Sequence, residues 1–270
     1  MKYNELILGG EGLIGAELAR ALRARGHEVA SLDLKSGVDL RCEDHREAFE
    51  ACDRVWFLAW DTGGAKYHSS ANVQHEMYRN NCQLSARVFE TLAATKRPFL
   101  FVTSQLAGQP TAYGLTKLMA ERWAAQLGGK VARLWNTYGW ERPDEKSHVV
   151  TDVALTALSE KRVRMMTTGE ERRRFIYKTD CVEALIRFFD AERTTVDIAG
   201  EEWITIRHLA EEVGRQLSVP VEPGRLAGTE VMIDPADPLP NWAPAVTLEE
   251  GLARVIAEAR EYLQRKAEGG

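Results

Sequence analysis

The hydrophobic and polar positions of the chain follow two alternating patterns. Short apolar runs of the kind that form buried strands are separated by longer segments in which apolar residues recur at helical spacing. The predicted strands cover 6–8, 26–33, 54–59 and 98–102. The predicted helices cover 13–22, about 44–52, about 71–95 and 113–127. Because strands alternate with helices, the pattern predicts an α/β protein with a doubly wound parallel sheet.

Three glycines follow the first apolar run at intervals of three residues, namely Gly9, Gly12 and Gly15. The helical pattern begins directly after them with Leu13 and Ile14. A strand, a glycine turn and a helix form the arrangement that places a pyrophosphate against helix amides. The glycines alone also fit a glycine-rich loop in an ordinary α/β protein. The context favours a dinucleotide site that includes all five residues.

Two acidic residues after the second predicted strand extend this site. Asp33 lies about 20 residues beyond the glycine turn, where a carboxylate grips the ribose hydroxyls of NAD and repels the 2′-phosphate of NADP. Lys35 lies nearby and leaves NADP open. Asp39 and Leu40 are placed to contact adenine, although a surface turn explains Asp39 equally well.

The third predicted strand ends in a segment with polar residues and glycines. Strand ends are where open α/β sheets build their sites, so we expect Leu58, Ala59 and Trp60 to line the cofactor. Trp60 could equally fill the core. Gly63 and Gly64 follow and are candidates for contact with a substrate.

A second group of candidate residues follows the fourth predicted strand. Thr103 and Ser104 end that strand, and Tyr113 and Lys117 lie four residues apart at the start of a helix. This spacing places the phenol and the ammonium on one helical face. An ammonium beside a phenol lowers the pKa of the phenol, and a strand-end hydroxyl can bond the same substrate oxygen. The four residues therefore indicate an acid/base device for a sugar or alcohol hydroxyl, with Thr103 as the main hydroxyl and Ser104 as its aid.

Composition narrows the class of protein. The chain has 270 residues, 44% hydrophobic, 28% charged, and a net charge of −5. This balance is that of an ordinary globular protein and gives no basic footprint for nucleic acid or an anionic membrane. No apolar stretch is long enough to span a bilayer, and the start of the chain leaves no room for a signal peptide. Four scattered cysteines suit reduced thiols in the cytoplasm, and no metal site is expected.

These motifs, taken together, resemble the extended short-chain dehydrogenase/reductases of the nucleotide-sugar epimerase/dehydratase group, from Leu6 to about Leu252. The resemblance implies a Rossmann fold, bound NAD and a Ser/Thr–Tyr–Lys catalytic set. It assigns Asn81 to the cofactor, Asn136 to the phosphate of a substrate nucleotide, and Arg173 to a sugar-nucleotide diphosphate. A solvated charged turn is the alternative for Arg173.

Within this group, two segments resemble GDP-mannose 3,5-epimerase and GDP-fucose synthase. They are the run from Leu58 to Gly64, with its Gly-Gly pair, and the pair Asn80-Asn81 in the next helix.

The chain also departs from the group at several places. Gln105 stands where 4,6-dehydratases carry an acid, and an amide cannot accept the proton of that elimination. The segment 106–108 lacks the cysteine of the 3,5-epimerase. Only ten positions separate Thr103 from Tyr113, so a substrate-covering loop is missing. The interval between Asp33 and Asp39 is short as well, as in some sugar-nucleotide reductases.

The sequence therefore predicts an NAD-dependent nucleotide-sugar epimerase that acts through a transient keto sugar. An NAD(P)H-dependent reductase or dehydrogenase with the same residues is the alternative, and a nucleotide-sensing module without catalysis is a third. The NAD-binding domain is expected at 1–145 plus about 175–200, and a small interleaved substrate-binding lobe at about 146–174 and 201–270. The resemblance implies a homodimer built on the helices that carry Asn81 and Tyr113. The sugar, the nucleotide, the reacting carbon and the pathway stay open, and so does a non-nucleotide substrate.

Overall fold

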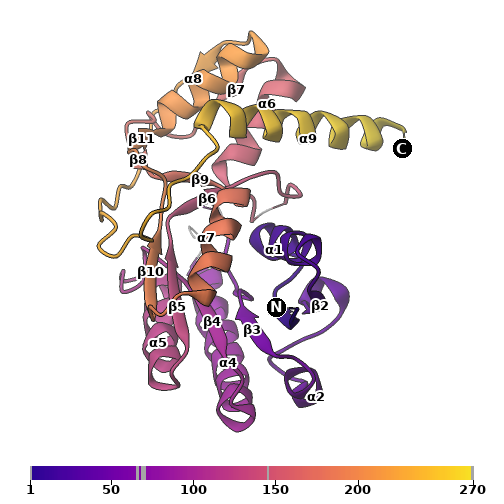
Figure 1. The fold of residues 1–270 in the computed structure, drawn as a ribbon. Helices are drawn as coiled ribbons and strands as arrows, with labels where there is room; N and C mark the ends of the chain where they lie inside the picture. The colour runs from indigo at the N-terminus through magenta and orange to yellow at the C-terminus, as the bar shows by residue number, and fades with distance from the viewer. Residues whose placement is uncertain (1, 65–66, 68–70, 145, 269–270) are drawn as a thin grey trace.

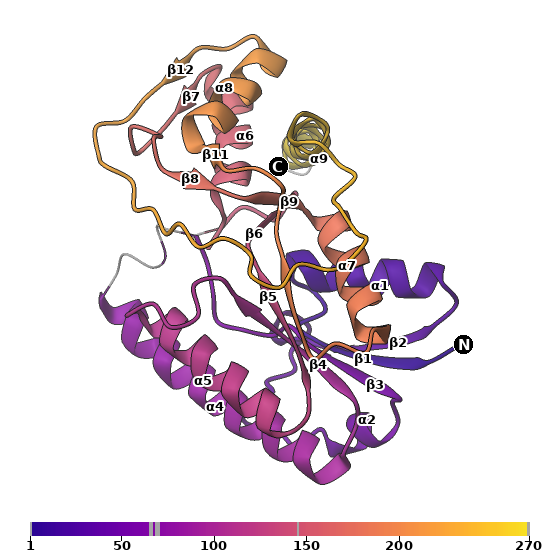
Figure 2. The same ribbon diagram turned by 60° about the vertical axis from the view of Figure 1, so that its left-hand side comes forward.

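The computed structural model describes residues 2–64, 67, 71–144 and 146–268. Its centre is a six-stranded sheet in the order β10-β5-β4-β3-β1-β2, and every pairing within it is parallel (Figures 1 and 2). These strands are β1 (Asn4–Leu8), β2 (Glu28–Leu32), β3 (Arg54–Phe57), β4 (Phe99–Ser104), β5 (Lys130–Leu134) and β10 (Thr195–Ile198). The predicted doubly wound parallel sheet is confirmed.

The path of the chain around β1 determines where a ligand can bind. From β1 the chain goes to its neighbour β2 on one side, and from β2 it crosses to β3 on the other side. This reversal creates a switch point between β1 and β3, where open α/β sheets bind ligands beyond the carboxyl ends of their strands. The short interval after Asp33 holds only the 3-10 turn η1 (Leu34–Ser36), because it is too short for a further strand and crossover.

Helices cover both faces of the sheet (Figure 2). One face carries α1 (Leu13–Ala24) and α7 (Lys178–Asp190), which pack on each other and on Trp56 and Leu100. The opposite face carries α2 (Arg46–Glu50), α4 (Ala71–Thr95) and α5 (Ala112–Gln126), around Phe57, Phe89 and Phe101. Neighbouring strand residues thus point into different cores, as the period of two requires. Among the described residues, no helix combines the length and the apolar character that a membrane crossing needs.

A second group of elements lies beyond the carboxyl ends of the strands (Figure 1). Three helices form it, α6 (Val149–Glu160), α8 (Ile206–Leu217) and α9 (Leu248–Glu268), and we call them the helical cap. They share a core of their own. The cap also carries short strand pairs: β6 (Asn136–Tyr138) with β9 (Phe175–Tyr177), β7 (Val163–Arg164) with β12 (Val221–Glu222), and β8 (Arg172–Arg173) with β11 (Ile204–Thr205).

The chain enters the cap after β5 and returns to the sheet through α7 and β10, so the two parts are interleaved. The segment before α9 then runs back along the sheet. Ala236 and Asp237 donate backbone N–H groups to the Asp197 carboxylate on β10, at 2.7 and 3.0 Å. This segment covers the edge strand, which would otherwise expose unpaired backbone groups.

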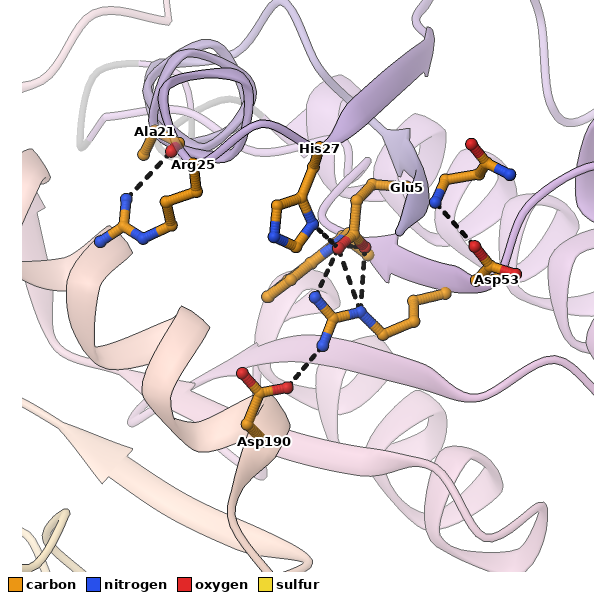
Figure 3. A network of polar contacts seen from close by, with 9 residues as sticks. Glu5, Ala21, Arg25, His27, Asp53 and Asp190 are labelled. Carbon is orange, nitrogen blue, oxygen red and sulfur yellow. Dashed lines mark hydrogen bonds and ion pairs between the residues drawn. The ribbon is translucent and has the colours of Figure 1, made fainter. Parts of the chain in front are cut away.

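The opposite, amino-terminal end of the sheet contains a buried network of charged groups (Figure 3). Glu5 on β1 is 1% exposed and accepts hydrogen bonds from Trp56 Nε1 at 2.8 Å and from Arg54 Nε at 3.1 Å. His27 Nδ1 lies 2.7 Å from the same carboxylate, and Arg54 also pairs with Asp190 at 2.6 Å. The buried Glu5 carboxylate therefore has both an ion-pair partner and hydrogen-bond partners, as a buried charge requires.

Candidate active site at the carboxyl ends of the strands

The glycine turn joins β1 to α1 at the switch point. Gly9 has φ +89°, and a Cβ on it would lie 2.6 Å from Ala59 N, so the turn packs directly on the end of β3. A Cβ on Gly15 would lie 2.1 Å from Gly9 O. Gly12 is the N-cap of α1 and makes no side-chain cap bond, so the first turn, with Leu13 and Ile14, is left for an anion.

Asp33 closes one side of this turn. Its carboxylate is 9% exposed and accepts backbone N–H groups from Glu11 at 2.9 Å and from Lys35 at 2.8 Å. These bonds fix the carboxylate beside the glycine turn and leave lone pairs for ribose hydroxyls. The Lys35 ammonium lies 3.3 Å from Glu11 O, so it is bonded within the same turn.

The expected adenine contact has a different environment. Arg41 Nε and Nη2 donate to the Asp39 carboxylate at 2.8 and 2.7 Å, and Arg41 Nη1 donates to Asn80 Oδ1 at 2.7 Å. Hydrogen bonds from Arg41 lower the pKa of Asp39 to about 2. The neighbouring Leu40 is buried in the core beside α2 and α4. Asp39 is thus ion-paired with Arg41 and anchors its loop. The sequence alone did not predict Arg41 as its partner.

Helix α5 brings Lys117 into the interior. Thr111 caps the helix by accepting from Gly114 N at 3.0 Å, and Lys117 lies two turns further on and is 3% exposed. Its ammonium donates to Val102 O at 2.7 Å and lies 4.0 Å from the centroid of the Trp60 ring. Burial lowers the pKa of Lys117 well below its usual value. Trp60 is therefore both part of the core, against Phe101, and a wall beside this amine.

The phenol of Tyr113 lies on the same side of the helix. Lys117 Nζ is 5.9 Å from the centroid of its ring. We expected the ammonium to lower the pKa of Tyr113, but burial raises it above the ordinary value. The reason is that both groups are withdrawn from water and the ammonium bonds to a backbone carbonyl. Hydrogen bonds with Ser104 and Thr62 act in the opposite direction, toward the phenolate.

The structure therefore distinguishes between the two hydroxyls at the end of β4. Ser104, which we expected only to assist, hydrogen-bonds the phenol of Tyr113. Thr103, to which we assigned the main role, is 2% exposed and its Oγ1 has no hydrogen-bond partner among the described residues. By the period of two, Thr103 shares the strand face of Phe101, toward α4 and α5, and Ser104 shares the face of Val102, so Ser104 acts on the phenol from the very end of β4.

Two further polar residues stand beyond the strand ends. Gln105 Nε2 donates to Asn136 Oδ1 at 3.1 Å, which links the end of β4 to the start of β6. Gln105 is 7% exposed, and in the described part of the chain its Oε1 finds no donor. Asn136, predicted to contact the substrate, thus lies next to the strand that carries Ser104.

Asn81 and the two glycines shape the segment after β3. Asn81 is fully buried, accepts from Asp61 N at 2.8 Å and donates to Asp61 O at 3.1 Å. Its side chain fixes the strand end, and its contact with a cofactor stays a prediction. Gly64 donates to Lys146 O at 2.9 Å, and a Cβ on it would lie 2.3 Å from Ser147 O. Gly63 is buried as well, and its Cβ would meet the Tyr67 ring at 2.9 Å.

Arg173 lies on β8 of the cap. Its guanidinium donates to Arg172 O at 2.7 Å and to Thr229 O at 2.6 Å, and burial lowers the pKa of the group. The arginines on both sides are ion-paired, Arg172 with Glu230 and Arg174 with Asp234. No contact among the described residues joins Arg173 to Tyr113, so the structure leaves its role in substrate binding a prediction.

Sequence reasoning missed Thr62 and Asp61. A hydrogen bond with Thr62 acts to lower the pKa of Tyr113, and the Asp61 carboxylate accepts from Asn80, Tyr67 and Lys146. Their position after a buried strand was the available signal, since strand ends converge at one edge of a parallel sheet. Across the residues that the structure describes, no group of three His, Cys, Asp or Glu side chains is placed to hold a metal ion.

Solved structures with the same fold cover almost the whole chain. An epimerase, Mth375, from Methanothermobacter thermautotrophicus superposes with a TM-score of 0.84 at 18% identity, over 98% of this chain and 95% of that one. The UDP-glucuronic acid 4-epimerase of Bacillus cereus, in complex with UDP-glucuronic acid and NAD, superposes with a TM-score of 0.78 at 18% identity, over 96% of this chain and 99% of that one.

The relatives found by sequence are named for reactions of nucleotide sugars. GDP-mannose 3,5-epimerase 1 of Oryza sativa subsp. indica is 25% identical over 100% of this chain and 85% of the rice protein. UDP-glucuronic acid decarboxylase 1 of Xenopus tropicalis is 25% identical over 97% of this chain and 73% of the frog protein. A model of the NAD dependent epimerase/dehydratase family matches residues 6–199. With its glycine turn, Asp33 and the Tyr113–Lys117 helix at one edge of a parallel sheet, the chain belongs to the NAD-dependent epimerase/dehydratase family.

Proposed function

We propose that the protein is an NAD-dependent nucleotide-sugar epimerase in which Tyr113 moves the hydroxyl proton. The observation that carries the proposal is the gathering of Tyr113, Lys117 and Ser104 beside the glycine turn at the switch point. The substrate class follows the relatives, whose names include GDP-mannose and UDP-glucuronic acid.

The residues of the turn fit a dinucleotide. The close packing of Gly9 on Ala59 leaves no room for a side chain, and the first turn of α1 offers backbone N–H groups to a pyrophosphate. Asp33 supplies a fixed negative charge for the two ribose hydroxyls, which favours NAD over NADP. We assign the nicotinamide side to the ends of β3 and β4, with Leu58 and Trp60 as its wall.

Bound NAD supplies a temporary two-electron acceptor for the carbon whose configuration is inverted. Tyr113, as phenolate, takes the hydroxyl proton of that carbon and returns it when the carbonyl is reduced on its other face. Ser104 bonds the reacting oxygen and the phenol together. Lys117 uses one N–H on Val102 O, and we assign its other N–H groups to the cofactor ribose.

The cap supplies the substrate side in this proposal. Residues 146–174 and 201–270 form the substrate-binding lobe, and 1–145 with about 175–200 form the cofactor domain. Arg173 binds a phosphate group of the substrate, for which a guanidinium is suited. Asn136, held by Gln105, and the backbone at Gly63 and Gly64 complete the substrate contacts.

The first experiment is a denaturing extraction of purified protein followed by mass spectrometry. An epimerase regenerates its cofactor in every cycle, so we expect stoichiometric NAD in the extract. A panel of GDP- and UDP-sugars should then show an isomerised product with no net change in NADH absorbance. An empty protein that oxidises or reduces a substrate with free NADH or NADPH would instead establish the reductase.

We also propose a cytoplasmic homodimer built on α4 and α5. These helices pack side by side on the outer face of the sheet, and Tyr78, Leu115 and Met119 are 37–42% exposed there. Cys42, Cys52, Cys82 and Cys181 are free thiols, which suits a reducing compartment. Sedimentation should give a dimer at micromolar concentration, and Met119→Glu should weaken it. A monomeric wild type would contradict the assignment.

A further inference from the structure

The buried amine of Lys117 lies among aromatic rings from three parts of the chain. Its Nζ is 4.0 Å from the centroid of Trp60, after β3, 4.9 Å from that of Phe101 on β4, and 5.9 Å from that of Tyr113 on α5. Its hydrogen-bond acceptor is Val102 O, at 2.7 Å. Within the described residues no salt bridge joins this amine to a carboxylate, so the rings are the main groups that can compensate its charge.

Trp60 presents a fixed ring face to this amine. Its ring meets that of Phe101 edge-on, with 5.5 Å between the centroids, and lies 6.2 Å from that of Phe57. The chain directly after it is anchored as well, because the Asp61 N–H donates to Asn81 Oδ1 at 2.8 Å. Packing and backbone bonds thus hold the indole in place independently of the amine.

Packing alone does not account for a tryptophan at this position. The indole Nε1 of Trp60 is buried and finds no acceptor among the residues that the structure describes. A buried donor without a partner costs free energy, and a phenylalanine or a leucine would fill this part of the core without that cost. An indole does offer a cation the most favourable ring face of the natural side chains.

We propose that Trp60 is a positioning residue for Lys117, whose ammonium its ring face holds beside Val102 O in the charged form. The ring attracts the ammonium as a whole charge, so the N–H groups that are not bonded to Val102 stay available to the cofactor. This inference deepens the proposed function and rests on it, since it concerns the amine that we assign to the cofactor ribose.

The chemical consequence is that more of the buried amine stays protonated. Burial lowers the pKa of Lys117 well below its usual value, and a cation–π contact acts in the opposite direction. Tyr113 is the titratable group beside it on its own helix. A charged amine there favours the phenolate of Tyr113, so the indole acts on the proton transfer through the lysine.

The charged groups on the elements around this amine have partners of their own. Glu121, one turn further along α5, pairs with Arg133 on β5 at 2.6 Å. Asp61, at the end of the β3 segment, pairs with Lys146 at 2.7 Å. Strand β4 and the buried positions of α4 that the structure describes carry no charged side chain. The ring face of Trp60 is therefore the nearest group that favours the charged form of Lys117.

The test compares Trp60→Leu, which removes the ring face, with Trp60→Phe, which keeps a smaller one. Trp123→Leu is the matched control, because Trp123 lies on the same helix and in the same core, with its ring 5.3 Å from that of Phe89. The purified proteins, labelled with ε-13C lysine, are titrated by NMR, and Lys117→Met identifies the resonance of Lys117. Each variant is also assayed for kcat against pH, for bound NAD and for urea unfolding.

We expect Lys117 to titrate about one pH unit lower in Trp60→Leu than in the wild type, as for the loss of a desolvated cation–π contact. Its kcat at neutral pH should fall by up to about tenfold, in proportion to the charged amine. Trp60→Phe should show smaller changes, and Trp123→Leu should lose stability but keep the wild-type titration. A Lys117 titration in Trp60→Leu at the wild-type pH or above it would overturn the inference.

A fluorinated tryptophan at position 60 gives the same comparison if Trp60→Leu does not fold, because fluorine weakens the negative ring face and nearly keeps its shape. Lys117 should then titrate lower with each added fluorine, and the absence of this trend would also overturn the inference. The titrations need no substrate. If they behave as expected and no sugar nucleotide is epimerised, the proposed function alone fails.

Discussion

Buried charged groups have different kinds of partner at the two ends of the central sheet. At the amino-terminal end, Glu5 is surrounded by Arg54, Trp56 and His27, and Arg54 has a second carboxylate in Asp190 (Figure 3). At the carboxyl-terminal end, Lys117 is also deeply buried, but its neighbours in the described part of the chain are a backbone carbonyl and aromatic rings. Two polar atoms at the same end of the sheet, Thr103 Oγ1 and Gln105 Oε1, lack partners in the part of the chain that the structure describes.

The difference separates a structural network from a site. Where each charge has an opposite charge, burial is compensated and nothing is left to bind or react. Where an amine is buried without one, its charged form is disfavoured and its pKa falls, as perturbed groups at functional sites do. The same depth of burial therefore serves stability at one end and chemistry at the other.

The largest effect is expected from Tyr113→Phe. Removing the phenol hydroxyl takes away the proton acceptor, so turnover should fall about a thousandfold while bound NAD is retained. Epimer formation and the NAD content of denatured protein are the measurements. Tyr78→Phe, on the exposed side of α4, is the control and should keep full activity. Substantial turnover in Tyr113→Phe would contradict the assignment of this edge as the catalytic one.

Arg54→Ala should have the largest effect on stability at the other end. It leaves Glu5 buried without its main partner, and we expect the free energy of unfolding to fall by about 3–5 kcal/mol. Lys2→Ala removes the exposed Lys2–Glu28 pair and should leave the same quantity nearly unchanged. Urea unfolding measures both. Similar small losses of stability in the two variants would contradict this difference between the buried Arg54–Glu5 pair and an exposed pair.

Ser104→Ala and Thr103→Val sharpen the description of the catalytic edge. Ser104 contacts the phenol, so its loss should lower kcat about a hundredfold, as the loss of one catalytic donor does. Thr103 Oγ1 makes no hydrogen bond within the described residues, and its replacement by an isostere should change kcat by no more than about twofold. Steady-state kinetics measures both losses of kcat. A larger loss in Thr103→Val than in Ser104→Ala would support Thr103 as the main hydroxyl, as the sequence predicted.

Lys117→Met should change the free energy of unfolding in the opposite direction. Replacing a buried amine by an apolar side chain is expected to raise the free energy of unfolding at neutral pH by about 1–2 kcal/mol, while activity is lost. The pKa of Lys117 is lowered in the folded state, so between that pKa and about 10.4 the unfolded chain binds more protons. Wild-type stability should therefore rise with pH across this window relative to Lys117→Met. A parallel pH dependence in the two proteins would show that the amine is not desolvated.

Much of the fold could be predicted from the sequence. The first four strands and the long helix α4 were predicted to within a few residues, because buried strands and amphipathic helices have different apolar periods. The glycine turn was recognisable for a similar reason, since close contacts such as that of Gly9 with Ala59 admit no side chain. The pair Tyr113 and Lys117, to which we assign the catalysis, could be recognised because residues four apart on a helix necessarily share a face.

What the sequence determined by itself is thus the local order of strands, turns and helices and the chemical types gathered near strand ends. Only the tertiary structure decided which hydroxyl meets Tyr113, since that depends on how the end of β4 lies against α5. It also decided that Lys117 is desolvated, that Asp39 is held by Arg41, and that Asp61 links β3 to the cap. Hydrogen bonds and burial depend on neighbours that are distant in the chain, and the periodicity of a single segment contains no record of them.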